Sequence, residues 1–118
     1  MPRLIDLNPA WIDHGDRKGL GVAFDCMVGT HRFQGKDVPC TIRNWVLFAN
    51  PLDGGPPWPG HSRTLIVAVF PNGADTEIAG CGTCRWTRTG DTFEALSMTP
   101  SVDAHVCGHF TLTDGVFR

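Results

Sequence analysis

The sequence predicts a mainly β fold, a small antiparallel sheet or sandwich with a zinc-ribbon-like metal clamp, in one domain that spans residues 1–118. Three observations support this prediction. The 14 Gly and 9 Pro residues divide the chain into short segments, which favours turns and strands over helices. Apolar residues alternate with other residues in several short runs, which is the period of a half-buried strand. No segment shows a sustained helical period.

Residues 1–19 are expected to form an irregular N-terminal arm that packs on the body of the domain. Five apolar side chains are available for this packing: Leu4, Ile5, Leu7, Trp11 and Ile12. The first predicted strand is 19–26, because alternate apolar residues fall on one face of an extended chain. Cys26 ends that apolar row.

The middle of the chain predicts two more strands separated by loops. A turn-rich segment at 27–40 leads to a strand at 44–49, which is apolar on both faces as buried strands are. Segment 50–60 contains four Pro and three Gly and is expected to be a loop of fixed shape. The most apolar run, 63–70, predicts a central strand that ends in a turn at 71–73.

The C-terminal part predicts a strand at 92–99, which Pro100 and Ser101 would end, and then a closing hairpin. An extended chain at 105–112 would place alternate residues on opposite faces: Val106, Phe110 and Leu112 on one, and His105, Cys107, His109 and Thr111 on the other. A turn at Asp114-Gly115 would then return the chain through its last residues.

Charge and cysteine content narrow the classes of function. The formal net charge of −2 and the pI near 6.2 provide no basic surface for nucleic acid. No apolar run approaches the roughly 20 residues that span a bilayer, and the N-terminal segment does not resemble a signal peptide. We therefore expect a cytoplasmic protein whose partner is another protein. The 5 cysteines are then expected to be reduced, and their odd number argues against a complete set of disulfides.

Six residues are candidate zinc ligands: Cys26, His31, Cys81, Cys84, Cys107 and His109. A structural Zn²⁺ takes four Cys or His ligands, commonly as two closely spaced pairs. In one arrangement Cys26 and His31 oppose Cys107 and His109. In the other, the Cys-x-x-Cys pair at 81 and 84 joins Cys107 and His109. A third possibility is that these residues bind no metal and are ordinary core or surface residues.

Two other interpretations of the Cys and His residues are weaker. Adding His105 to the row of Cys107 and His109 would stretch it to about 13 Å, too far for one ion on a straight strand. A thioredoxin-like dithiol at Cys81 and Cys84 would need a helix after the motif, and residues 85–88 show no helical pattern.

Two charged residues, Asp53 and Arg88, lie in sequence motifs, and each motif allows either a functional or a structural role. Asp53 could be a catalytic residue on a rigid glycine loop, but an Asp-Gly-Gly turn more often uses its carboxylate to accept hydrogen bonds from nearby backbone N–H groups. Arg88 could bind an acidic ligand. It could equally flank a β-turn at Thr89-Gly90-Asp91.

Five motifs occur in order along the chain: FDC (24–26), FANPLDGG (48–55), WTRTGDTFEAL (86–96), TPSV (99–102) and CGHF (107–110). Together they resemble a family of small uncharacterised proteins of bacteria and their phages, some of which are labelled ammonia monooxygenase. The resemblance covers about half of the chain and implies a zinc-binding β domain. The chain departs from the family where further cysteines usually follow Cys26, and it has one residue fewer between Cys107 and His109. It also carries extra sequence that contains Cys81 and Cys84.

Two hypotheses for function follow. The first is a non-enzymatic module whose structural Zn²⁺ substitutes for a larger core and whose surface binds a protein partner. The second is a zinc hydrolase, in which three protein ligands leave a position open for water and Asp25, Glu94 or Asp103 carries the proton. We favour the module, because the sequence contains no motif such as H-E-x-x-H.

Overall fold

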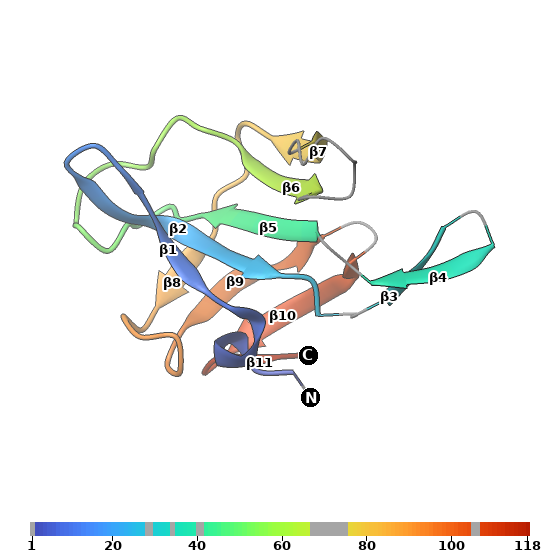
Figure 1. Ribbon diagram of the computed structural model, residues 1–118. Helices are drawn as coiled ribbons and strands as arrows, with labels where there is room; N and C mark the ends of the chain where they lie inside the picture. Colours follow the sequence, from blue (N-terminus) through green and yellow to red (C-terminus); the bar gives the residue numbers. More distant parts are fainter. Residues whose placement is uncertain (1, 28–29, 34, 40–41, 67–75, 105–106) are drawn as a thin grey trace.

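The computed structural model describes residues 2–27, 30–33, 35–39, 42–66, 76–104 and 107–118, and the side chains of all these except residues 30–33, 36, 38–39, 63–66 and 76–79. The described chain forms two antiparallel sheets and a separate hairpin (Figure 1). The predicted mainly β fold is therefore confirmed. The elements are a short 3-10 helix η1 (Leu4–Leu7) and the strands β1 (Ala10–His14), β2 (Arg17–Asp25), β3 (Thr30–Phe33), β4 (Lys36–Pro39), β5 (Ile42–Leu47), β6 (Ser62–Ile66), β7 (Thr76–Cys81), β8 (Thr87–Thr89), β9 (Ser97–Asp103), β10 (His109–Thr113) and β11 (Val116–Phe117).

The first sheet has the strand order β1-β2-β5-β6-β7. The strands predicted at 19–26 and 44–49 correspond to β2 and β5, which pair from Gly21 opposite Leu47 to Asp25 opposite Arg43. Strand β6 lies between β5 and β7, so the first part of the predicted central strand at 63–70 is confirmed. Residues 67–70 and the predicted turn at 71–73 lie outside the described residues.

The second sheet has the strand order β11-β10-β9-β8. Its last two strands form the predicted closing hairpin, with Leu112 opposite Phe117 and Thr113 opposite Val116. Asp114 and Gly115 both have positive φ angles, 47° and 74°, as a two-residue hairpin turn requires. The turn prediction at these two residues is confirmed.

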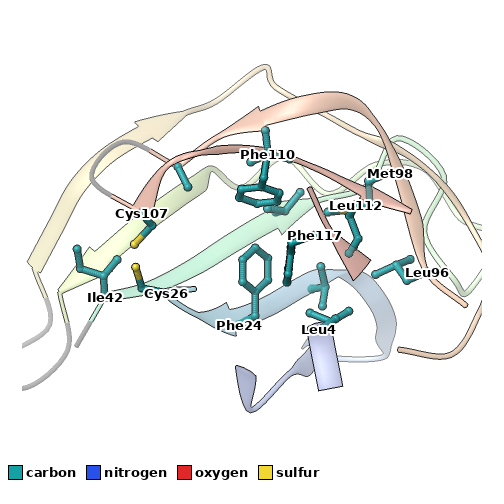
Figure 2. Packing of buried hydrophobic residues seen from close by; sticks show 14 of the residues in the cluster. Leu4, Phe24, Cys26, Ile42, Leu96, Met98, Cys107, Phe110, Leu112 and Phe117 are labelled. Carbon is teal, nitrogen blue, oxygen red and sulfur yellow. The ribbon is translucent and has the colours of Figure 1, made fainter. Parts of the chain in front are cut away.

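The main core lies between the two sheets and is rich in aromatic side chains. Phe24 of β2 meets Phe110 of β10 and Phe117 of β11, with ring centroids 5.8 and 5.2 Å away, and these two rings lie 4.8 Å apart (Figure 2). All three are at most 3% exposed. Such offset and edge-to-face contacts add to the free energy gained by burying the rings. The two sheets are thus joined by one apolar interior.

The N-terminal segment is regular, so the prediction of an irregular arm at 1–19 is wrong. Strand β1 pairs with β2, with Ala10 opposite Ala23 and Trp11 opposite Val22. Two of its apolar side chains are buried, since Leu4 is 0% exposed and Ile12 is 6% exposed. Polar residues and prolines interrupt the apolar pattern of this segment, so the sequence does not indicate a strand here. An edge strand tolerates such residues, because it pairs with a neighbour on one side only.

The segment 27–40, predicted to be rich in turns, also contains two strands. Strands β3 and β4 pair from Thr30 opposite Pro39 to Phe33 opposite Lys36. Gly35, at a φ of 77°, lies between them and joins two short strands rather than ending regular structure. In Figure 1 this hairpin extends away from the two sheets.

The strand predicted at 92–99 is displaced towards the C-terminus. Residues near Thr92 form a turn, in which the Ala95 N–H donates to the Thr92 carbonyl at 3.2 Å. The strand is β9, which continues through Pro100 instead of ending there. Its pairing with β10 is irregular between Phe110 and Leu112, so the missing N–H of Pro100 falls where the ladder is interrupted.

Candidate functional site

Two cysteines that are far apart in the sequence meet at one end of the main core. Cys26 directly follows β2 of the first sheet, and Cys107 precedes β10 of the second. They are 7% and 1% exposed, and their sulfur atoms point toward one another in Figure 2. The Cys26 N–H donates to the carbonyl of Ile42 at 3.1 Å, which ties this residue to β5. Two metal-ligand side chains therefore converge from opposite sheets.

Cys107 and His109 do not share a face, and that prediction is wrong. His109 is exposed, and its Nε2 is hydrogen-bonded to the Ser101 hydroxyl at 2.8 Å. Cys107 lies in a turn, because its N–H donates to the Ala104 carbonyl at 3.0 Å and the next residue, Gly108, has a φ of 101°. The turn breaks the two-residue alternation of a strand. Cys107 consequently faces the core, while His109 faces solvent.

The remaining predicted ligands lie elsewhere. His31 belongs to β3, and its side chain is outside the described residues, as is all of His105. Cys81 and Cys84 form a disulfide, which departs from the expectation that the cysteines are reduced. In this oxidised state neither sulfur is a thiolate, and the pair could bind a metal only after reduction.

The disulfide forms part of the wall of a groove of about 510 Å³. The groove lies between β5 of the first sheet, the 80–86 segment and β9 of the second sheet. Its apolar lining includes Trp45, Trp86 and Val102, and its acidic lining residue is Asp103. Apolar walls with a few polar groups are typical of ligand sites.

Arg85 and His61 lie beside the disulfide, and sequence reasoning missed both. The Arg85 guanidinium donates to the carbonyls of Cys84, Trp58 and Gly60 at 2.7, 2.6 and 2.6 Å, and burial lowers the pKa of Arg85. A Cβ placed on Gly82 would lie 3.3 Å from His61 Nε2, so this ring lies against the disulfide loop. The pairing of β6 with β7 brings it there, with Ser62 opposite Cys81. No spacing in the sequence signals that contact.

Asp53 has the structural role that the sequence favoured. Its Oδ1 accepts from the Gly55 N–H at 2.9 Å, and its Oδ2 accepts from the Lys18 N–H at 3.2 Å. The Arg17 guanidinium also donates to Oδ2 at 2.6 Å. The hydrogen bond from Arg17, followed by that from Gly55, holds the pKa of Asp53 well below its usual range. The carboxylate therefore stabilises the loop through these hydrogen bonds.

The three acids considered as proton carriers do not gather around one site. Asp25 forms an ion pair with Arg43 at 2.9 Å, Glu94 is exposed, and Asp103 lines the groove.

Across the described residues, no group of three or more His, Cys, Asp or Glu side chains could hold a metal ion. No helix in the described part of the chain is long and apolar enough to cross a membrane. Searches of protein-family models, curated proteins and solved structures found no match to this chain.

Proposed function

We propose that this chain is a small zinc-binding β module, in which a structural metal ion joins the two sheets and the surface binds a protein partner. The observation that carries the proposal is the convergence of Cys26 and Cys107 at one end of the core. An ion held by both thiolates would link β2 to the turn before β10. In a domain of 118 residues, such a link would add stability that a modest core does not supply.

The burial of the two sulfurs supports a structural ion over a catalytic one. A zinc hydrolase needs a coordination position that water and substrate can reach, and Cys26 and Cys107 are 7% and 1% exposed. The proposal includes a cytoplasmic location, where thiols are kept reduced and available to a metal.

A tetrahedral site needs two further ligands. His31 remains a predicted ligand. His105 and Cys40 are added as candidates on the sequence alone, since each precedes a described residue of this region, Cys107 and Ile42, by two positions. His105 and Cys40, like the His31 side chain, lie outside the described residues, so substitution has to identify the ligands. Exposed His109, which is bonded to Ser101, is expected to be dispensable.

The experiment is elemental analysis of protein purified without chelator or added metal, followed by X-ray absorption at the zinc edge. We expect about one zinc per chain with sulfur among its ligands. Cys26→Ser and Cys107→Ser should each lose the metal, and chelation of the unaltered protein should lower its melting temperature.

The matched control is the double variant Cys81→Ser/Cys84→Ser, which changes the other described cysteine pair and should keep the metal. Single substitutions of His31, Cys40, His105 and His109 then identify the remaining ligands. Protein that is folded and free of metal would overturn the proposal. Loss of zinc from the double variant with retention in Cys26→Ser would instead select the Cys-x-x-Cys arrangement.

A further inference from the structure

The Cys81–Cys84 disulfide is poorly suited to stabilise the fold. It closes a loop of sequence separation 3, and a disulfide constrains the unfolded chain less as its loop becomes shorter. Both cysteines are half-buried rather than enclosed in the core. Solvent-accessible disulfides are commonly the labile or catalytic ones. A role in thiol chemistry accounts for the position of this bond better than a role in stability.

Arg85 carries a fixed positive charge and lines the same groove as the disulfide. Three backbone carbonyls hold the Arg85 guanidinium beside Cys84, and within the described part of the chain it has no carboxylate partner. A nearby cation stabilises a thiolate and lowers the pKa of the thiol. The Thr83 hydroxyl lies 3.8 Å from Cys81 Sγ and can donate to it. Both features favour release of a cysteine thiolate when the disulfide opens.

The same place offers a proton carrier and a binding surface. The His61 ring is exposed and lies against Gly82, a residue of the loop that the two cysteines close. The groove of about 510 Å³ that the disulfide helps to line, with Trp45 and Trp86 in its walls, has the size of a small-molecule or peptide site. A thiol bound there would reach a disulfide that is part of the wall.

We propose that Cys81 and Cys84 form a redox-active pair that exchanges with thiols bound in this groove. The thiolate of the first substrate attacks Cys84 Sγ, a mixed disulfide forms, and the bond to Cys81 Sγ breaks. Cys81 leaves as a thiolate and takes up the proton that His61 removed from the attacking thiol. A second substrate thiolate attacks the substrate sulfur of the mixed disulfide and releases Cys84, which is then protonated. Two substrate thiols become one disulfide, and the two electrons reside on the reduced pair.

The test incubates the oxidised full-length protein with glutathione and, separately, with a short peptide that contains one cysteine. Alkylation and mass spectrometry then count the new thiols. We expect two new thiols, those of Cys81 and Cys84, to become alkylated. The circular dichroism spectrum should stay unchanged. Each arm should run faster than the same thiol against oxidised dithiothreitol. A faster peptide arm identifies polypeptide thiols as substrates, and a faster glutathione arm identifies small thiols.

Variants separate catalysis from simple exposure of the bond. His61→Gln should slow exchange roughly tenfold or more, whereas His14→Gln, a change at another exposed histidine, should not. Cys81→Ser, incubated with oxidised glutathione, should trap a mixed disulfide on Cys84, because the variant lacks the neighbouring thiol that would displace glutathione. Three results would overturn the proposal: a pair that stays oxidised in glutathione buffer, exchange no faster than the reference in both arms, or a reduced pair that takes up Zn²⁺ and stops reacting. Because the pair is not a ligand in the proposed zinc site, zinc content in the same samples tests that proposal independently.

Discussion

Asn50 and Arg88 bind each other through two hydrogen bonds that join the side-chain amide of one to the backbone of the other. Asn50 Nδ2 donates to the Arg88 carbonyl at 3.0 Å, and the Arg88 N–H donates to Asn50 Oδ1 at 2.9 Å. The Arg88 guanidinium donates to the carbonyls of Pro51 and Gly90 at 3.3 and 3.0 Å. The proline-rich loop and the segment after Trp86 therefore form one unit, and the guanidinium stabilises that unit through two of its carbonyls.

Asn50→Ala should lower the free energy of unfolding by about 1–3 kcal/mol, because two hydrogen bonds of about 0.5–1.5 kcal/mol each are lost. Urea denaturation measures this change. Asp91→Ala, at an exposed residue of the same segment, is the control and should change the free energy by less than about 0.5 kcal/mol. Equal stability of the two variants would mean that the Asn50 pairing contributes nothing.

Gly90→Ala should destabilise the protein more than Gly15→Ala. Both glycines have positive φ angles, 83° and 58°, so each substitution costs about 1–2 kcal/mol of backbone energy. A Cβ at Gly15 would meet nothing within 4 Å, whereas a Cβ at Gly90 would collide with the carbonyl oxygen of Ala95. Denaturation midpoints for the two variants measure the difference. A Gly15→Ala protein as unstable as Gly90→Ala would contradict the packing argument.

Phe24→Ala should lower the free energy of unfolding by about 3–5 kcal/mol, the usual cost of removing a buried aromatic ring. The ring packs on both Phe110 and Phe117, so the cavity would open where the sheets meet. Phe24→Leu keeps part of the volume and should cost less. Thermal denaturation of both variants measures this order, and the reverse order would show that the site collapses around the smaller residue.

The ion pair of Arg17 and Asp53 should make stability depend on pH in the acid range. The folded pKa of Asp53 is lowered, so its contribution is present above the unfolded pKa of about 3.9 and is lost as pH falls through the folded pKa. The melting temperature of Asp53→Asn should lie below that of the unaltered protein at pH 7. The gap should be constant down to about pH 5 and should then shrink progressively as the pH falls towards the folded pKa. Asp16→Asn, at an exposed residue, is the control. A gap that is independent of pH would exclude the ion pair as its cause.

Alternation of apolar residues located β2 and the final hairpin, and a run that is apolar on both faces located β5, because each of these elements buries apolar side chains in the core. Such patterns failed for β1 and for the start of β9. The first strand, β1, forms at the edge of the sheet beside β2. There, backbone pairing with β2 stabilises the strand, and β1 does not bury a whole apolar face. Around Thr92, Phe93 stacks on Trp11 with ring centroids 4.4 Å apart, so an apolar residue in a turn was mistaken for part of a strand.

The candidate site was harder to anticipate than the fold. The sequence identified Cys26 and Cys107 as residues that could meet, but it paired Cys107 with His109 on an assumed straight strand. The turn closed by Ala104 and Gly108 reverses that assignment, with the Ala104 N–H bonded to the Gly108 carbonyl at 2.8 Å. The resemblance to the bacterial and phage family and the zinc ligand set both remain predictions.

The sequence by itself determined that the chain is β-rich and where several of its strands and its final turn lie, because side-chain alternation and turn residues act over a few positions. Only the tertiary structure decided which chemical groups are neighbours. Cys26 lies beside Cys107, and His61 beside the Cys81–Cys84 loop, because strand pairing and the packing of two sheets join residues whose separation along the chain carries no signal.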